Sequence, residues 1–198
     1  MTRIIAGFAG SRELAVPKSG TRPTSDRVRE AIFSALDARD AIMDARALDL
    51  YAGSGALGLE ALSRGARSVV LVEKHPKAAE IARKNADLIC SVGKLAPASA
   101  QVVVNSVAHF LDGRVDSAGS TGNFDLVFID PPYDVADAEL DDVLAALAPL
   151  LSPGAEVVVE RSTRSAAPQA PVGLTLDKSK AYGETTIHWL SRDHLSRD

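Results

Sequence analysis

The tetrapeptide Asp130-Pro131-Pro132-Tyr133 places a carboxylate, two prolines and an aromatic ring directly after a short apolar run. An exocyclic amine on a nucleobase is a poor nucleophile, because its lone pair is delocalised into the ring. If the Asp130 carboxylate and the Pro131 carbonyl accept hydrogen bonds from its two N–H groups, they favour a pyramidal nitrogen whose lone pair can face a methyl donor. Tyr133 offers a face for stacking the base. The motif predicts methylation of a base amine, with adenine and guanine both open, and its expected catalytic residues are Asp130, Pro131 and Tyr133.

A glycine-rich turn, with Gly53, Gly55 and Gly58, follows another apolar run and has the spacing of nucleotide-binding sites. At the end of the next apolar run, Glu73 can accept both hydrogen bonds from a ribose diol. The same glycine spacing suits a dinucleotide, but the Asp49 carboxylate would repel a pyrophosphate and suits the ammonium and sulfonium charges of S-adenosylmethionine. The turn therefore predicts S-adenosylmethionine as the cofactor. The expected cofactor-binding residues are Asp49, Tyr51, Gly53, Gly55, Glu73, Lys74, Asn105 and Ser106, the last two near the adenine ring.

Both motifs also have a purely structural interpretation. A glycine turn can serve packing alone, and prolines commonly end a strand and open a loop in which Asp130 would only cap the next turn. The two motifs occur together, each at the end of an expected strand, and this favours the chemical interpretation.

Short, nearly continuous apolar runs alternate with helical patterns along the chain, which is typical of an α/β domain whose parallel sheet is covered by helices on both faces. The expected strands span residues 47–51, 68–72, 102–104, 124–129 and 155–160. The expected helices span residues 26–36, 57–64, 76–89 and 138–151. Residues 174–176 and 185–190 are expected to form two closing strands, antiparallel at the sheet edge. Residues 112–123 and 163–173, rich in Gly, Ser, Ala or Pro, are expected to be poorly ordered.

The basic side chains gather at the start of the chain. Residues 1–30 hold six basic and three acidic side chains, although the whole chain has a net charge of -4. Residues 3–8 and 12–16 have the pattern of a small β-hairpin. We therefore expect residues 1–20 to form a basic hairpin extension, residues 21–198 to form the methyltransferase domain, and any contact with a polyanion to concentrate at the N-terminal end.

Composition excludes several other classes of protein. Hydrophobic residues make up 46% and charged residues 24% of the 198 residues, which is typical of a globular protein. No apolar run approaches the roughly 20 residues that span a bilayer, and the apolar start is too short for a signal peptide. The single cysteine and the four histidines lack metal-ligand spacing. We expect a cytoplasmic monomer without a metal site or a membrane contact.

Four segments together resemble the bacterial RsmD family: residues 22–33, 48–55, 130–133 and 182–185. The resemblance covers residues 3–189, and the first segment is its most specific part. It implies a Rossmann-like class I S-adenosylmethionine-dependent methyltransferase with a mostly parallel seven-stranded sheet and an N-terminal β-hairpin. It further implies that one methyl group goes to N2 of a guanine, guanine 966, in 16S ribosomal RNA of the assembling small subunit.

The resemblance also implies roles for individual residues. It assigns Glu73 to the ribose, Asp130 and Pro131 to the target amine, and Tyr133 to the base, and it places residues 22–33 beside the cofactor and the substrate. Where such enzymes often carry an Asp near the adenine amine, this chain has Asn105-Ser106. The residues expected to bind the RNA substrate are Arg3, Arg12, Arg22, Thr24, Arg27 and Pro132.

Three alternatives remain open at this point. A DNA adenine N6 methyltransferase would use the same Asp130 chemistry, although 198 residues leave no room for a separate target-recognition domain. A nicotinamide-dependent oxidoreductase would use the same glycines, and a catalytically silent RNA-binding module would use neither motif.

Overall fold

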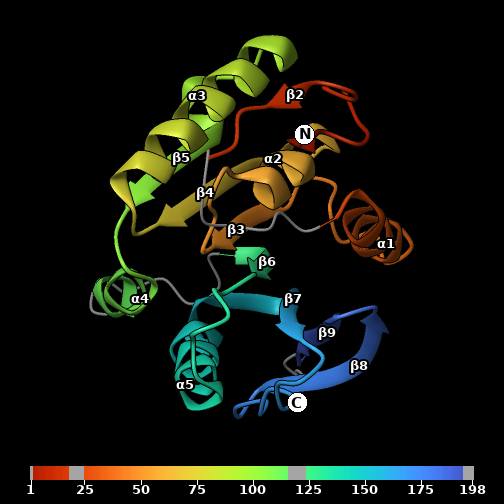
Figure 1. Cartoon of the computed structure of the whole chain (residues 1–198), viewed down its shortest axis with the longest axis vertical. Helices are drawn as coiled ribbons and strands as arrows, with labels where there is room; N and C mark the ends of the chain where they lie inside the picture. The colour runs from red at the N-terminus through yellow and green to blue at the C-terminus, as the bar shows by residue number, and fades with distance from the viewer. Residues whose placement is uncertain (1, 18–24, 116–123, 194–198) are drawn as a thin grey trace.

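A seven-stranded sheet forms the centre of the molecule in the computed structural model, which describes residues 2–17, 25–115 and 124–193 (Figure 1). Its strand order is β5-β4-β3-β6-β7-β9-β8. The first five of these strands pair in parallel, and β9 pairs antiparallel with both β7 and β8. The strands are β3 (Arg46–Leu50), β4 (Ser68–Glu73), β5 (Ala100–Val104), β6 (Phe124–Ile129), β7 (Leu151–Ser162), β8 (Leu174–Tyr182) and β9 (Thr185–Arg192). The expected fold class is confirmed.

Helices cover both faces of this sheet, so the molecule has three layers. The helices are α1 (Asp26–Asp37), α2 (Ala56–Ser63), α3 (Pro76–Gly93), α4 (Val107–Val115) and α5 (Asp137–Leu147), with short 3₁₀ turns at Pro97–Ser99 and Ala148–Leu150. One buried cluster joins α1, α2 and α3 to the sheet, and a second joins α4 and α5 to its other face. Figure 1 shows α1 on the opposite side of the central strands from α4 and α5. Within the described part of the chain, no helix is long and apolar enough to cross a membrane.

The order of the strands reverses between β3 and β6. The chain runs outward from β3 to β4 and β5, and then returns to place β6 on the other side of β3. Helices on either side of such a switch point diverge, and ligands of open α/β sheets bind there, outside the carboxyl ends of the strands. The fold thus places the candidate site after β3, β4 and β6.

Most strand and helix predictions are correct to within a few residues, and the largest deviations have identifiable causes. Helix α5 ends at Leu147 rather than at residue 151, because Pro149 lacks an N–H and its ring clashes with a helical carbonyl. Strand β7 consequently begins at Leu151 rather than at residue 155. Strand β8 extends to Tyr182 rather than ending at residue 176. It lies at the edge of the sheet, where polar side chains are compatible with a strand, so its sequence lacks the apolar pattern that predicts one.

The two segments expected to be poorly ordered are corrected by the structure. Residues 112–115 form the last turn of α4, a helix that the sequence analysis missed, and residues 116–123 lie outside the described residues. Residues 163–173 form neither helix nor strand, but they are fixed to α5. The Ala166 N–H donates to Asp137 Oδ2 at 3.3 Å, and the Gln169 N–H donates to Asp141 Oδ1 at 2.8 Å.

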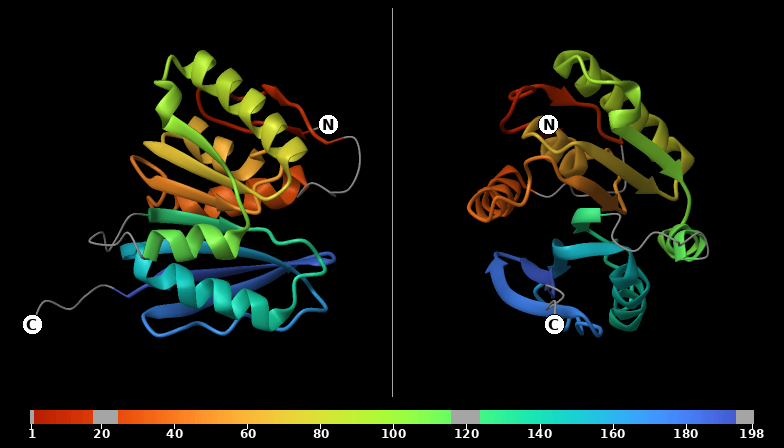
Figure 2. Two further views of the ribbon diagram at one scale, coloured as in Figure 1. Left: turned by 90° about the vertical axis from the view of Figure 1, so that its left-hand side faces the viewer. Right: turned by 180° about the vertical axis from the view of Figure 1, so that it is seen from behind.

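The N-terminal hairpin is confirmed, but its strands are much shorter than expected. Strands β1 (Thr2–Arg3) and β2 (Glu13–Leu14) pair antiparallel. Ile4 still exchanges backbone hydrogen bonds with Ser11 and Arg12, and residues 5–10 turn over α2. Its side chains Ile4, Ala9 and Leu14 are buried in the same cluster as α1, α2 and α3. Both views of Figure 2 show this segment beside α2 and α3. The boundary at residue 20 stays a prediction, but residues 2–14 share the core of the domain.

Glu60 and Ser63 of α2 hold this N-terminal segment. Glu60 is fully buried, and its carboxylate accepts hydrogen bonds from the backbone N–H groups of Ile5 (2.6 Å) and Ala6 (3.0 Å) and from Arg64 Nε (2.7 Å). The Ser63 hydroxyl accepts from the Ala9 N–H at 3.0 Å and donates to the Ala6 carbonyl at 2.7 Å. Two side chains of α2 thereby form the hydrogen bonds that the backbone of this irregular segment does not form within a regular strand or helix.

Gly7 makes the closest approach between this segment and α2. Its φ is +80°, and an added Cβ would lie 1.9 Å from the Ser63 carbonyl oxygen. We expect Gly7→Ala to lower the free energy of unfolding by about 2–4 kcal/mol, through the left-handed backbone and the overpacking together. Urea denaturation measures this loss. Gly10→Ala is the matched control, because its Cβ would make only ordinary contacts; equal losses for both variants would contradict the prediction.

Candidate active site

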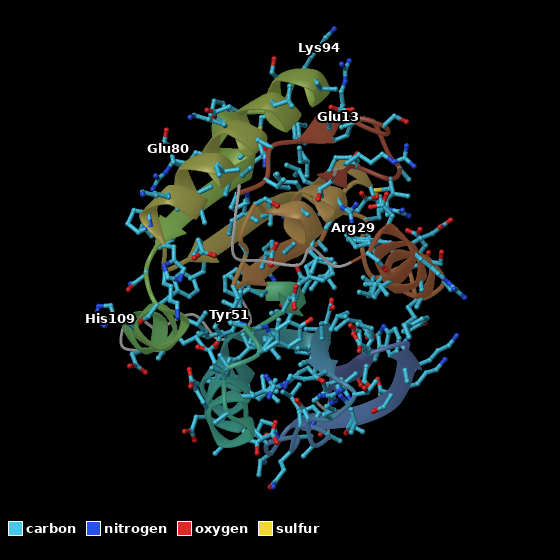
Figure 3. The ribbon with its side chains drawn as sticks, in the orientation of Figure 1. Glu13, Arg29, Tyr51, Glu80, Lys94 and His109 are labelled. Carbon is cyan, nitrogen blue, oxygen red and sulfur yellow. The ribbon has the colours of Figure 1, made fainter. Side chains whose placement is uncertain are left out.

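The candidate site is built from the segments that follow β3, β4, β5 and β6. Because these strands are parallel neighbours, their carboxyl ends meet at one edge of the sheet. Tyr51, directly after β3, lies near the centre of the molecule in Figure 3. It has a φ of +64°, which is rare for a residue with a side chain, and burial raises the pKa of its hydroxyl to about 12. This strained turn brings the glycine segment back across the end of β4.

Glu73 joins the end of β4 to the glycine turn. Its Oε2 accepts the Gly53 N–H at 2.9 Å, its Oε1 accepts the His75 N–H at 2.8 Å, and only 7% of the residue is exposed. An ionised carboxylate has about four acceptor positions, so these two bonds orient the group and leave capacity for a diol. The arrangement fits the expected ribose contact, which stays a prediction.

The three glycines of the turn have different reasons to be glycine. Gly53 has a φ of +55° and open space where a Cβ would stand, so its backbone is accessible to a ligand. Added Cβ atoms at Gly55 and Gly58 would instead lie 2.8 Å and 2.5 Å from the side chain of Leu71. Gly55 and Gly58 are therefore required for close packing against Leu71, whereas Gly53 is the glycine whose missing side chain leaves room for a ligand.

Asp49 lies beneath the turn, facing α2. It is 2% exposed, and its Oδ2 accepts the N–H of Gly58 at 2.9 Å. Burial raises the pKa of this carboxyl to about 7, and the nearby Glu73 raises it too, while the Gly58 hydrogen bond opposes the shift. A buried, strongly perturbed carboxyl at a strand end is typical of functional sites. One of its oxygens is nevertheless committed to positioning α2.

The residues after β4 and β5 are more exposed. Lys74 is exposed, and Asn105 and Ser106 bond to local backbone. Asn105 Oδ1 accepts the Ser106 N–H at 2.9 Å, and Ser106 Oγ accepts the His109 N–H at 3.3 Å, which caps the start of α4. A helix-capping role thus accounts for Ser106, and the adenine contact of both residues stays a prediction.

The tetrapeptide that starts at Asp130 follows β6 and changes from buried to exposed along its length. Asp130 is half-buried, Pro131 is buried, Pro132 is exposed, and Tyr133 is 75% exposed. The Val135 N–H donates to the Pro132 carbonyl at 3.1 Å and closes a turn. The exposed ring of Tyr133 is therefore available for a base to stack on.

Arg161 of β7, which the sequence analysis missed, fixes the loop after this tetrapeptide. It is 7% exposed, and its Nη2 donates to the Val135 carbonyl at 2.9 Å and to Asp137 Oδ1 at 2.8 Å. The signal in the sequence is an arginine that directly follows the apolar residues 157–159 and Glu160 at the carboxyl end of the strand. A charge buried there needs partners, and these partners lie in the candidate site.

A cavity of about 670 Å³ opens beside Tyr133. Its lining comes from residues 133–137 after β6, from Arg161 and Ser162 at the end of β7, from Arg164 and Ser165 just after it, and from Glu184 between β8 and β9. Glu184, from the segment 182–185 that carries part of the resemblance, therefore lines the same cavity as Tyr133.

Asn85 of α3 is a second residue that the sequence analysis missed. Its Nδ2 donates to the carbonyls of Ser54 and Ala15, both at 2.9 Å, and its Oδ1 accepts the Ala15 N–H at 2.9 Å. The side chain is buried and thus links the glycine turn to the N-terminal segment. Its position in a regular helical pattern gives no signal for this role.

The expected RNA-binding residues fall into two groups. Arg3, Arg12 and Arg27 are exposed, whereas Arg22 and Thr24 lie outside the described residues. Arg3 Nε lies 3.7 Å from Asp26 Oδ2, which brings β1 to the start of α1. Arg29 is buried between them, and its Nη2 donates to the Arg3 carbonyl and to Asp26 Oδ1, both at 2.7 Å (Figure 3). Arg29 is therefore structural and Arg3 is accessible, which sequence spacing alone does not distinguish.

The described residues contain no group of three or more His, Cys, Asp or Glu side chains that could hold a metal ion.

Comparisons with known proteins agree with this geometry. The family model described as "Conserved hypothetical protein 95" matches residues 2–191. The chain is 35% identical over 192 residues to "Ribosomal RNA small subunit methyltransferase D" of Escherichia coli (strain K12), which covers 96% of this chain and 90% of that protein. It is 37% identical over 183 residues to the protein of the same name from Haemophilus influenzae, which covers 91% and 89%.

A solved structure agrees as well. "Putative methyltransferase yhhF from Escherichia coli" superposes with a TM-score of 0.78 at 34% identity and covers 96% of this chain and 97% of that one. The family-model match over residues 2–191 includes the N-terminal segment, the glycine turn, the tetrapeptide and the β8–β9 turn. The chain therefore belongs to the "Conserved hypothetical protein 95" family, the RsmD family of methyltransferases that its four motifs resemble.

Proposed function

We propose that this methyltransferase transfers a methyl group from S-adenosylmethionine to N2 of a guanine, guanine 966, in 16S ribosomal RNA of the assembling small subunit in the cytoplasm. The observation that carries the proposal is the position of Asp130–Tyr133 at the end of β6, next to the strand whose glycine turn is bonded to Glu73. The names of the two relatives, ribosomal RNA small subunit methyltransferases, support the RNA substrate.

The residues of the chain divide the reaction between them. Bound S-adenosylmethionine supplies a methyl group already activated on a positively charged sulfur. The Glu73 carboxylate accepts hydrogen bonds from the two hydroxyls of its ribose. The accessible backbone at Gly53 lets the ligand approach closely. The Asp130 carboxylate and the Pro131 carbonyl accept hydrogen bonds from the two N–H groups of the guanine amine and turn its lone pair toward the methyl carbon. Asp130 then takes the proton that the amine releases, while Tyr133 stacks on the base.

The central test uses unmodified small subunits and S-adenosylmethionine with a radiolabelled methyl group. Label is expected in 16S ribosomal RNA, and mass spectrometry of the digested RNA is expected to identify N2-methylguanine at one position. Genomic DNA in a parallel reaction tests the second candidate, a DNA adenine N6 methyltransferase, which the same Asp130 chemistry would serve. Label only in DNA, or only in protein, would overturn the proposal.

Cofactor binding is expected to depend on pH through Asp49. The pKa of this buried carboxyl is about 7, so it is mostly neutral at pH 6 and ionises as the pH rises. An ionised Asp49 attracts the positive charges of S-adenosylmethionine, so the affinity should rise by up to about eightfold between about pH 6 and 7.5. Calorimetric titration at both pH values measures the change. Asp49→Asn should abolish the dependence; an unchanged dependence in this variant would assign it to another group.

A further inference from the structure

We propose that Lys178 and Lys180 of strand β8 form a second RNA-contact surface of this methyltransferase, which binds phosphate groups of the small-subunit RNA beside the target nucleotide. This inference rests on the proposed function and adds a surface that lies far in the sequence from the basic residues of the N-terminal end. The chain has a net charge of -4, so its attraction to RNA has to come from a few basic surfaces rather than from the whole molecule.

Strand β8 is open to solvent where its lysines lie. It is an edge strand, and Figure 1 shows it at the end of the sheet opposite to α3. A strand with one covered face alternates between buried and exposed residues, but residues 177–181 are all exposed. A partner as large as RNA therefore has access to the lysine side chains of this strand.

Two aromatic rings hold the lysine side chains in place. Lys178 Nζ lies 5.8 Å from the centre of the Trp189 ring, and Lys180 Nζ lies 5.0 Å from that of the Tyr182 ring. An aromatic ring attracts an ammonium group but does not neutralise its charge, and the N–H donors that point away from the ring stay available. In the part of the chain that the structure describes, neither lysine forms an ion pair. Two positive charges are thus positioned without being neutralised, which suits an anionic ligand.

The acidic residue of β8 has partners of its own. Asp177 Oδ2 lies 3.7 Å from Arg39 Nη1, and Asp177 Oδ1 accepts a hydrogen bond from the Ser191 hydroxyl at 3.1 Å. Because this carboxylate is paired with a different cation, the two lysine charges remain available to an external anion.

The lysines lie on the path toward the candidate active site. Strand β9 is antiparallel to both β7 and β8, so β8 runs parallel to β7 and ends at the edge of the sheet where β3 and β6 end. Alternate residues of a strand are about 6.5–7 Å apart and face the same way, so Lys178 and Lys180 can each contact a different phosphate. Glu184, which lines the cavity beside Tyr133, follows Lys180 by four residues, so their Cα atoms lie within about 14 Å of each other. RNA that reaches this cavity therefore has neighbouring nucleotides close to the lysines.

The surface lies on the same face of the sheet as the N-terminal segment. Lys178 and Lys180 are the cross-strand partners of Trp189 and Ile187, and directly opposite residues of a sheet share a face. Trp189 and Ile187 belong to the buried cluster that also contains Ile4 of the N-terminal segment and the apolar side of α1. One RNA molecule can therefore contact both basic surfaces from the same side of the sheet.

The test measures the binding of unmodified small subunits at several salt concentrations. Lys178→Gln/Lys180→Gln removes both charges and keeps polar side chains on the edge strand. We expect Kd to rise about 3- to 30-fold, and the slope of log Kd against log salt concentration to fall by about 1.5, since each lost phosphate contact removes about 0.7–0.9. In methylation assays the KM for small subunits should rise by the same factor while kcat stays unchanged.

Two further variants serve as controls. Lys84→Gln removes the charge of an exposed lysine on α3, which is paired with Glu80 at 2.8 Å, and should change neither Kd nor the slope. Lys178→Arg/Lys180→Arg keeps both charges and should restore the Kd and the slope of the unaltered protein to within about twofold.

Each other outcome has a definite meaning. Lysines also protect an edge strand from pairing with other sheets, and that role alone predicts self-association of the double Gln variant with unchanged Kd and slope, which would overturn the surface. A lower kcat with an unchanged Kd and melting temperature, or an equal loss of binding in Lys84→Gln, would overturn it as well. If the unaltered protein methylates small-subunit RNA, these results leave the proposed function standing. If it methylates none, the proposed function is overturned, and the surface with it.

Discussion

Asp130→Ala is expected to lower the rate of methyl transfer by about 10²–10⁴-fold while the affinity for S-adenosylmethionine stays nearly unchanged. The variant removes the acceptor that turns the lone pair of the amine toward the methyl group and takes its proton. The bonds of Glu73 to Gly53 and His75, which shape the expected ribose site, do not involve this side chain. Single-turnover kinetics with labelled cofactor measures the rate, and calorimetry measures the affinity.

Two further variants sharpen this result. Asp130→Asn keeps an oxygen acceptor but cannot take the proton, so its rate should lie between those of the unaltered protein and Asp130→Ala. Asp87→Ala, which truncates an exposed carboxylate on α3, should leave both quantities unchanged. A parallel loss of rate and cofactor affinity in Asp130→Ala would indicate that Asp130 belongs to the cofactor site instead.

Glu60→Ala is expected to lower the free energy of unfolding by about 3–5 kcal/mol. It removes a fully buried carboxylate that accepts from two backbone N–H groups and from Arg64, and leaves these donors without their acceptor. Urea denaturation measures the loss, and hydrogen exchange should accelerate first at the amides of Ile5 and Ala6. Glu80→Ala makes the same chemical change at an exposed helix position, and a comparable loss in that variant would contradict the explanation.

The sheet was predictable because its central strands are apolar on both faces, and such runs are visible in a sequence. Strand β8 was only partly visible, since its edge position makes a polar sequence such as Asp177-Lys178-Ser179-Lys180 compatible with a strand. Helix α4 was missed because the glycine of its last turn suggested a loop. Its buried Phe110 and Leu111 stabilise it through contacts with the sheet, which only the tertiary structure provides.

The candidate site was predictable where its chemistry lies in a continuous segment. The glycine turn and Asp130–Tyr133 each form such a segment, at the ends of expected strands. Arg161 and Asn85 have partners 24 to 70 residues away, so no local pattern contains their role. The different reasons for Gly53 and Gly58 likewise depend on what stands opposite each Cβ position, and Leu71 comes from a neighbouring strand.

The anchoring of the N-terminal segment has a consequence for biosynthesis. The backbone of this segment is hydrogen-bonded to the side chains of Glu60, Ser63 and Asn85. These residues lie 54 to 70 residues further along the chain than their partners. Because a ribosome makes the N-terminus first, at about 5–20 residues per second, residues 4–15 leave it several seconds before the side chains that bind them. This first-made segment therefore docks only after α2 and α3 have emerged, and until then its apolar residues Ile4, Ala9 and Leu14 are accessible to chaperones.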